Sequence, residues 1–160
     1  MLLSESILTR LQYQHKTIDE LIDGLFEEEL KTRANPEKWS AFENIVHLAA
    51  YQPIFIKRIH LMLDENEPLF ERYVADNDPV FLQYKNKSLA ELLVTISIDR
   101  LIILDSAKKL NEEQLKRTGR HKAYGSITLA RWFDVFLLHE AHHLWTIFQL
   151  TYATRAAKHK

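Results

Sequence analysis

The chain of 160 residues contains no cysteine and only three glycines and four prolines. Without cysteine there are no disulfides and no thiolate ligands, so any bound metal needs His, Asp, Glu or water as its ligands. Scarce glycine and proline disfavour a many-turned all-β fold and are better tolerated by long helices. The composition therefore favours a helical protein.

Long apolar runs and an excess of one charge are also missing. No stretch reaches about 18 consecutive apolar residues, so no membrane-spanning helix is expected. The segment Met1–Glu5 has no basic residues ahead of an apolar run, so it does not resemble a signal peptide. With a net charge of −1, the chain has no strong positive electrostatic field that would favour binding to nucleic acid or to an acidic membrane. We expect a cytoplasmic protein with one domain over residues 1–160 and neither nucleic acid nor membrane as a partner.

Apolar residues recur at helical spacing in four long segments. The first helix is expected over about 6–30. The second begins after Ser40, whose capping box with Glu43 marks its start, and ends near 63. The third begins after Ser88, with Glu91 as its capping partner, and ends near 110. The last helix begins at 126 or 128 and ends near 156.

Between these segments the sequence is richer in turn-forming residues. Residues 64–87 are expected to form a long connection with one short helix near 69–74, because prolines interrupt it. Residues 111–114 resemble the start of a single helical turn, and 119–125 a loop. This order predicts an all-α fold, a four-helix bundle with a long crossover between the second and third helices and no strand.

The segment His139-Glu140-Ala141-His142-His143 is the clearest candidate for chemistry. His139 and His143 lie one turn apart on a helix, on the face that carries Phe136 and Ile147. Ring nitrogens on a buried face need partners, and a shared metal ion provides one. The other interpretation is a pair of core histidines bonded to side chains or water. His142 lies off this face and is interpreted as a surface or rim residue.

The same letters fit HExxH, the zinc protease signature. Such proteases take their third ligand from residues C-terminal to the motif. The residues that follow His143 contain no Asp or Glu, and their one histidine, His159, lies in a basic tail. We therefore disfavour a protease and interpret Glu140 as a surface or structural residue. No catalytic residue is assigned.

A third metal ligand must then come from another helix. His47 is the best candidate because it lies early in the second helix among apolar residues, although a lone histidine there is more often a satisfied core residue. His15, His60 and His121 each lie among polar or mixed neighbours, and for them a surface or hydrogen-bonded role is favoured.

Two segments resemble the DinB/YfiT-like superfamily. The run from Trp39 to Leu48, WSAFENIVHL, is similar to the W-S-x-x-E-x-x-x-H-L segment of that family. Ile127-Thr128-Leu129, followed by 138–143, is similar to its last helix, in which a T-L start leads to H-x-x-x-H. The resemblance implies a DinB-like four-helix bundle that is often a homodimer. It also implies one divalent metal ion bound by His47, His139 and His143.

The resemblance says less about the reaction than it says about metal binding. Members with known activity include transferases and isomerases that use a low-molecular-weight thiol, and others are described as metal-dependent hydrolases. The expected function is a metal-dependent enzyme acting on a small molecule, either a thiol S-transferase with such a thiol as cosubstrate or a hydrolase. Three histidines suit zinc, nickel, iron or manganese.

The alternative is a non-catalytic protein whose metal is structural or sensory. A fourth protein ligand, such as His15 or Glu140, would favour it because structural sites are closed. For the expected homodimer, Phe70, Tyr73 and Phe81 are candidate exposed aromatics.

Overall fold

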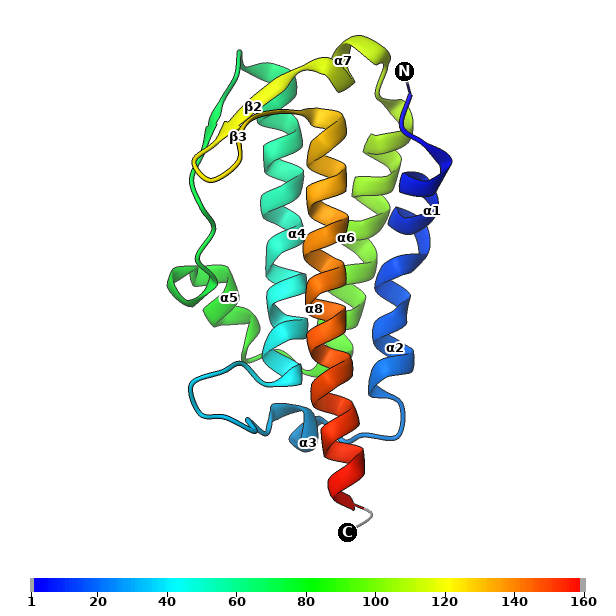
Figure 1. The fold of residues 1–160 in the computed structure, drawn as a ribbon, viewed down its shortest axis with the longest axis vertical. Helices are drawn as coiled ribbons and strands as arrows, with labels where there is room; N and C mark the ends of the chain where they lie inside the picture. Colours follow the sequence, from blue (N-terminus) through cyan, green and yellow to red (C-terminus); the bar gives the residue numbers. More distant parts are fainter. Residues whose placement is uncertain (1, 159–160) are drawn as a thin grey trace.

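The computed structural model describes residues 2–158. Its long helices run side by side (Figure 1). The first column consists of α1 (Glu5–Tyr13), the 3-10 turn η1 (Gln14–Lys16) and α2 (Thr17–Ile22). The other three are α4 (Ala41–Asp64), α6 (Leu89–Lys109) and α8 (Leu129–Lys158). The predicted four-helix bundle is therefore confirmed. Within the described part of the chain, none of the helices has the length and apolar character needed to cross a membrane.

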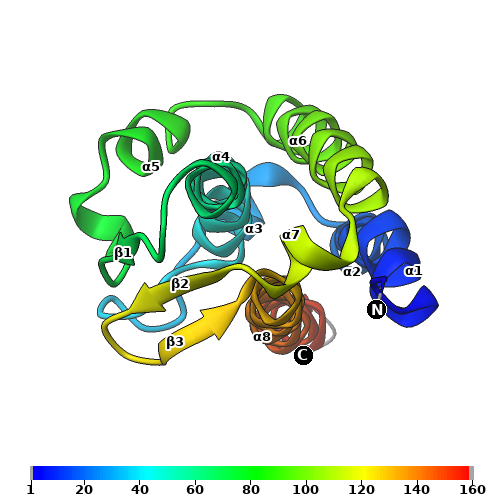
Figure 2. The same ribbon diagram turned by 90° about the horizontal axis from the view of Figure 1, so that it is seen from above.

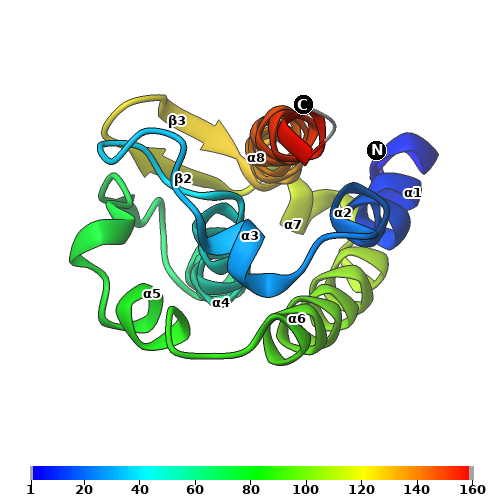
Figure 3. The ribbon, with the colours of Figure 1, turned by 90° about the horizontal axis from the view of Figure 1, so that it is seen from below.

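The columns are not arranged in chain order. The helix α4 packs chiefly against α6 and α8, and the α1–α2 column also packs against α6 and α8. The first column therefore lies diagonally opposite α4, as Figure 2 shows. The chain passes from one to the other through α3 (Glu27–Lys31), at the lower end of the bundle (Figure 3). This diagonal arrangement leaves α4 and α8 as neighbours, and both carry candidate ligands.

A capping box fixes the start of α4, as predicted. Ser40 Oγ accepts a hydrogen bond from the Glu43 N–H at 3.1 Å, and the Glu43 carboxylate accepts one from the Ser40 N–H at 3.0 Å. Glu43 also pairs with Arg33 and Lys85 from the flanking connections. Burial alone would raise the pKa of Glu43, but the bonds from Arg33, Ser40 and Lys85 outweigh it and lower the pKa to about 2. The start of α4 is thus held by charge from two sides.

The expected single helix over 6–30 is wrong. The helix narrows to the 3-10 turn at Gln14–Lys16 and then ends at Ile22. Two residues later Gly24 adopts a φ of 73°, a left-handed conformation that glycine accepts without strain. The other three long helices are confirmed as α4, α6 and α8, and α6 begins with the expected Ser88–Glu91 capping box. The helical turn expected from residue 111 is α7 (Glu112–Lys116), a short helix capped by Asn111.

The prediction of no strand is also wrong. A small sheet in the order β1-β2-β3 is formed by β1 (Leu69–Phe70), β2 (Thr118–His121) and β3 (Gly125–Thr128). β1 pairs in parallel with β2, and β2 pairs antiparallel with β3 from Thr118↔Thr128 to His121↔Gly125. Strands this short show no measurable alternation of apolar residues, which is why 69–74 was expected to be a helix and 119–125 a loop.

Close packing explains one glycine of the sheet. A Cβ added to Gly119 would lie 2.5 Å from Cε2 of Phe70 on β1 and 3.1 Å from Cγ of Met62 on α4, so any side chain there would force these packed groups to shift. The long connection ends with η2 (Ala75–Asn77) and α5 (Pro79–Tyr84), where Asp78 caps α5. The sheet and this connection together cover one flank of the α4–α8 pair (Figure 2).

The expected exposed aromatics are placed differently. Phe70 and Phe81 are buried and Tyr73 is half-buried, so they do not form an exposed patch. Trp145 is 58% exposed on α8.

Candidate metal centre

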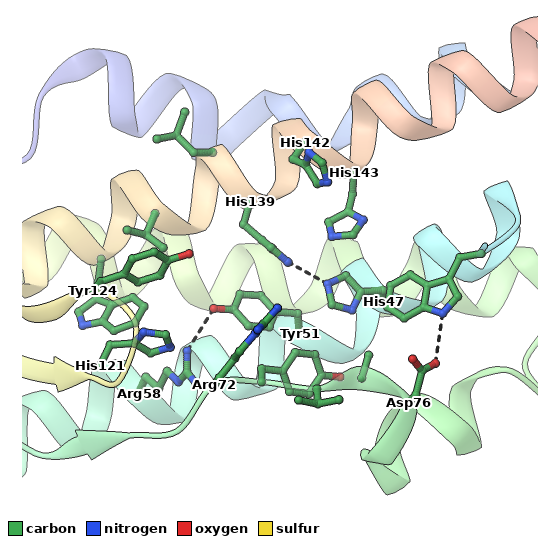
Figure 4. Close-up of a pocket in the computed structure, with 17 residues that line it drawn as sticks. His47, Tyr51, Arg58, Arg72, Asp76, His121, Tyr124, His139, His142 and His143 are labelled. Atoms are coloured by element: carbon green, nitrogen blue, oxygen red, sulfur yellow. Dashed lines mark hydrogen bonds between the residues drawn. The ribbon is translucent and has the colours of Figure 1, made fainter. Parts of the chain in front are cut away.

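Three histidines from two neighbouring helices gather beside the sheet. His47 on α4 and His139 and His143 on α8 each bring one ring nitrogen within 4.8 Å of the others. The two Nε2 atoms of His47 and His139 are 2.8 Å apart, and the ring centroids of His47 and His143 are 4.3 Å apart. Figure 4 shows the three rings pointing toward one another. Among residues 2–158, no further His, Asp or Glu joins this group.

The position of His47 follows from the burial of α4. A helical wheel places His47 off the main apolar stripe, but every residue from Ala41 to Gln52 is buried. The helix is enclosed all round in this half by α6, α8 and α5, so no side chain there faces open solvent. The candidate ligand set is therefore assembled by the packing of α4 on α8.

Burial keeps all three rings neutral. Burial and then the neighbouring His139 lower the pKa of His47 to about 3. Burial, followed by His142 and Arg58, lowers the pKa of His139 to about 4. For His143, burial and the adjacent histidines lower the pKa to about 2. A neutral imidazole has a free lone pair, which is the form that binds a metal. The donor set therefore fits a divalent metal ion.

Asn44, which the sequence reasoning missed, orients one of these rings. Its side-chain amide donates to the Ser40 carbonyl at 2.8 Å, which leaves its Oδ1 facing His143 Nδ1 at 2.8 Å. Since Oδ1 can only accept, Nδ1 of His143 carries the proton and Nε2 is left with its lone pair free. Asn44 lies one turn before His47, and this spacing is the only signal that could have indicated its role.

Replacing Asn44 with leucine should weaken metal binding by about 10–100-fold, because the ring of His143 loses the partner that sets its orientation and tautomer. Asn44→Asp is the matched variant, since it keeps an oxygen acceptor at the same place. Competition with a chromophoric chelator measures both affinities. Equal affinities for wild type and Asn44→Leu would show that the hydrogen bond has no part in the site.

The histidines line a pocket of about 670 Å³. Aromatic rings surround them, with centroids 5.1 Å (Trp39), 5.5 Å (Tyr73) and 6.1 Å (Tyr51) from that of His47. His142 is exposed and also lines the pocket, in agreement with its predicted place at the rim. The volume is sufficient for a small organic molecule.

Glu140 is a structural residue. It is 2% exposed and does not line the pocket; its carboxylate pairs with Arg100 of α6 and accepts a hydrogen bond from Gln14 Nε2 at 2.8 Å. Arg100 is itself 1% exposed and donates to Gln52 at 3.2 Å. Glu140 is therefore neither a general base for the pocket nor a fourth ligand, and the basis for a protease disappears.

The remaining histidines lie elsewhere. His15 is buried on η1, where burial and then Arg100 lower its pKa to about 4, and it is not part of the ligand cluster. His60 is exposed. His121 on β2 is buried and hydrogen-bonded, and it lines the far part of the same pocket. His159 lies outside the described residues.

The protein is thus a four-helix bundle with a pocket lined by three histidines that could hold a metal ion. The family model of the DinB superfamily matches residues 10–147, so the chain belongs to the DinB superfamily. The structure is similar to YfiT from Bacillus subtilis, with a TM-score of 0.78 over 93% of this chain and 86% of that chain, at 18% identity. YfiT is described as a probable metal-dependent hydrolase with an unusual four-helix bundle topology. At this identity the likeness shows a shared fold. The comparison with curated proteins yields no match.

Proposed function

We propose that this protein is a metal-dependent enzyme that acts on a small molecule, with His47, His139 and His143 as ligands of one divalent ion. One observation carries the proposal: three neutral histidines line a large pocket, and within residues 2–158 no fourth protein ligand accompanies them. Catalytic sites keep a coordination position open, whereas structural sites close it with protein ligands. A bound divalent ion would supply a nucleophile by lowering the pKa of a water or a thiol.

The carboxylates nearest the histidines are engaged in other contacts, so the proposed reaction does not rely on a carboxylate as its base. Glu140 is held by Arg100, and Asp76, which lines the pocket, accepts a hydrogen bond from Trp39 Nε1 at 3.1 Å. The exposed ring of His142 has its centroid 5.2 Å from that of His143 and lies at the rim of the pocket. Two reactions fit: hydrolysis and transfer to a low-molecular-weight thiol.

Activity assays on metal-loaded protein test the proposal. Protein loaded in turn with zinc, nickel, iron and manganese is incubated with a panel of esters and amides, and with thiols plus an electrophile such as chlorodinitrobenzene. Turnover is expected with at least one metal and one panel, and it should fall at least about 100-fold in His139→Ala, because the ion is lost. His60→Ala, at an exposed position, is the matched control and should keep full activity.

Two results would contradict the proposal. Turnover that survives both chelation and His139→Ala would place the reaction elsewhere. A protein that holds one metal ion per chain and turns over nothing in either panel would favour the structural or sensory alternative.

A further inference from the structure

Arg58 is a buried cation without a counter-ion. It lies on α4 about three turns beyond His47, lines the same pocket and is only 8% exposed. Its guanidinium donates to the Tyr51 hydroxyl at 3.3 Å and to the Glu71 backbone carbonyl at 2.7 Å. Both acceptors are neutral, and no ion pair to Arg58 exists within the described chain. The rings of Tyr51, Phe70 and Trp132 also face the guanidinium, but they leave its charge in place, and a buried charge with only neutral partners is costly unless a bound anion compensates it.

Two further donors surround this guanidinium. Trp132, whose ring centroid is 5.3 Å from Arg58 Cζ, is 1% exposed, and its Nε1–H has no hydrogen-bond partner among residues 2–158. His121 Nδ1 accepts the Ala123 N–H at 3.2 Å, so the neutral ring carries its proton on Nε2 as a donor. Both residues line the pocket, and the exposed Arg72 adds a second cation. In Figure 4, Arg58, His121 and Tyr124 lie together at one end, away from His143 and Asp76.

The end of the pocket at Arg58 offers N–H donors and positive charge, whereas the end at the three histidines offers nitrogen lone pairs. Tyr51 joins the two, because its hydroxyl accepts from Arg58 and its ring centroid is 4.4 Å from that of His139. A single small molecule can therefore reach both ends. Glu71, whose backbone carbonyl accepts from Arg58, does not neutralise it with its side chain, because the Glu71 carboxylate pairs with Lys122 at 2.8 Å.

We propose that Arg58, Trp132 and His121 form a subsite for the carboxylate of a small-molecule substrate whose reacting group lies at the three histidines. A carboxylate is flat, accepts two parallel N–H bonds from a guanidinium and cancels one positive charge, which is the charge that Arg58 leaves uncompensated. The part that concerns the reacting group rests on the proposed function. Binding of the carboxylate does not, because none of its partners is a candidate metal ligand.

The test uses metal-free protein from which the chelator has been removed, at constant ionic strength. Butyrate, its neutral isostere butyramide and inorganic phosphate are titrated while the indole N–H signals of ¹⁵N-labelled protein are recorded. Trp132→Phe assigns the signal of Trp132. We expect butyrate to move the Trp132 signal in a saturable way and butyramide to leave it in place. Phosphate should bind more weakly than butyrate, because one buried guanidinium compensates only one negative charge.

Variants locate the binding. Arg58→Gln should weaken butyrate binding at least about tenfold, and Arg58→Lys should retain part of the affinity because it keeps the charge. Arg131→Gln removes the same charge at an exposed position of α8 outside the pocket and should change nothing.

Three results would overturn the proposal: equal responses to butyrate and butyramide, a phosphate preference, or unchanged affinity in Arg58→Gln. The butyrate and butyramide comparison needs no variant, so it remains decisive if Arg58→Gln fails to fold. Since no metal is present, a positive result stands even if the metal-dependent activity is absent, and a negative one leaves that activity untouched.

Discussion

Glu140→Ala is expected to lower the free energy of unfolding by about 3–5 kcal/mol, which is the cost of leaving one member of a buried ion pair without its partner. The cost arises because Arg100, 1% exposed, would retain only Gln52 as a hydrogen-bonding partner. Urea unfolding of the metal-free protein measures the loss. The ring of Phe136, 4.7 Å from Arg100 Cζ, cannot replace a carboxylate.

The double variant Arg100→Met/Glu140→Ala distinguishes the effect of an unpaired buried charge from the effect of lost side-chain volume. Removing both charges should recover most of the lost stability, because apolar replacements of buried pairs are often neutral or stabilising. Both variants should bind metal as wild type does, since neither residue belongs to the cluster. A single variant as stable as wild type but inactive would instead assign a catalytic role to Glu140.

As the pH is lowered, the metal-free protein is expected to lose stability already near pH 6, before its carboxylates begin to titrate. Burial lowers the pKa of His15 to about 4, of His47 to about 3, of His139 to about 4 and of His143 to about 2. In the unfolded chain these groups titrate near pH 6.5, so the unfolded state binds more protons below that pH. Above about pH 6.5 these histidines cause no loss of stability. Below it, the free energy of unfolding decreases as the pH falls toward the folded-state pKa values.

By pH 5 each of these histidines should have cost about 1–2 kcal/mol of stability. Urea unfolding between pH 7.5 and 5 measures the slope, and added divalent metal should reduce it because only neutral rings are ligands. Stability that stays constant down to pH 5 would contradict the burial of neutral histidines.

Features set by neighbours in sequence were predictable. The Ser40–Glu43 and Ser88–Glu91 capping boxes each act within four residues, and both appear as expected. The spacing of His139 and His143 on one helix face is local in the same sense. These short-range rules place the helix starts and two of the three histidines.

Features that depend on distant residues were not predictable from periodicity. His47 joins the cluster through the packing of α4 on α8; its apolar neighbours made it a candidate, and the family resemblance was needed to indicate it as a ligand. Arg100 and Glu140 are 40 residues apart in the sequence, so their burial as a pair leaves no local pattern. The two-residue strand β1 exists because β2 lies beside it, and its own composition carries no strand signal.

The most direct test of the account is the metal content of purified protein measured by elemental analysis. Wild type and the control His60→Ala should each contain about one divalent ion per chain after loading and removal of free metal. His47→Ala, which removes the one ligand that comes from α4, should contain almost none while remaining folded by circular dichroism. The same metal content in all three proteins would show that these histidines do not form the site.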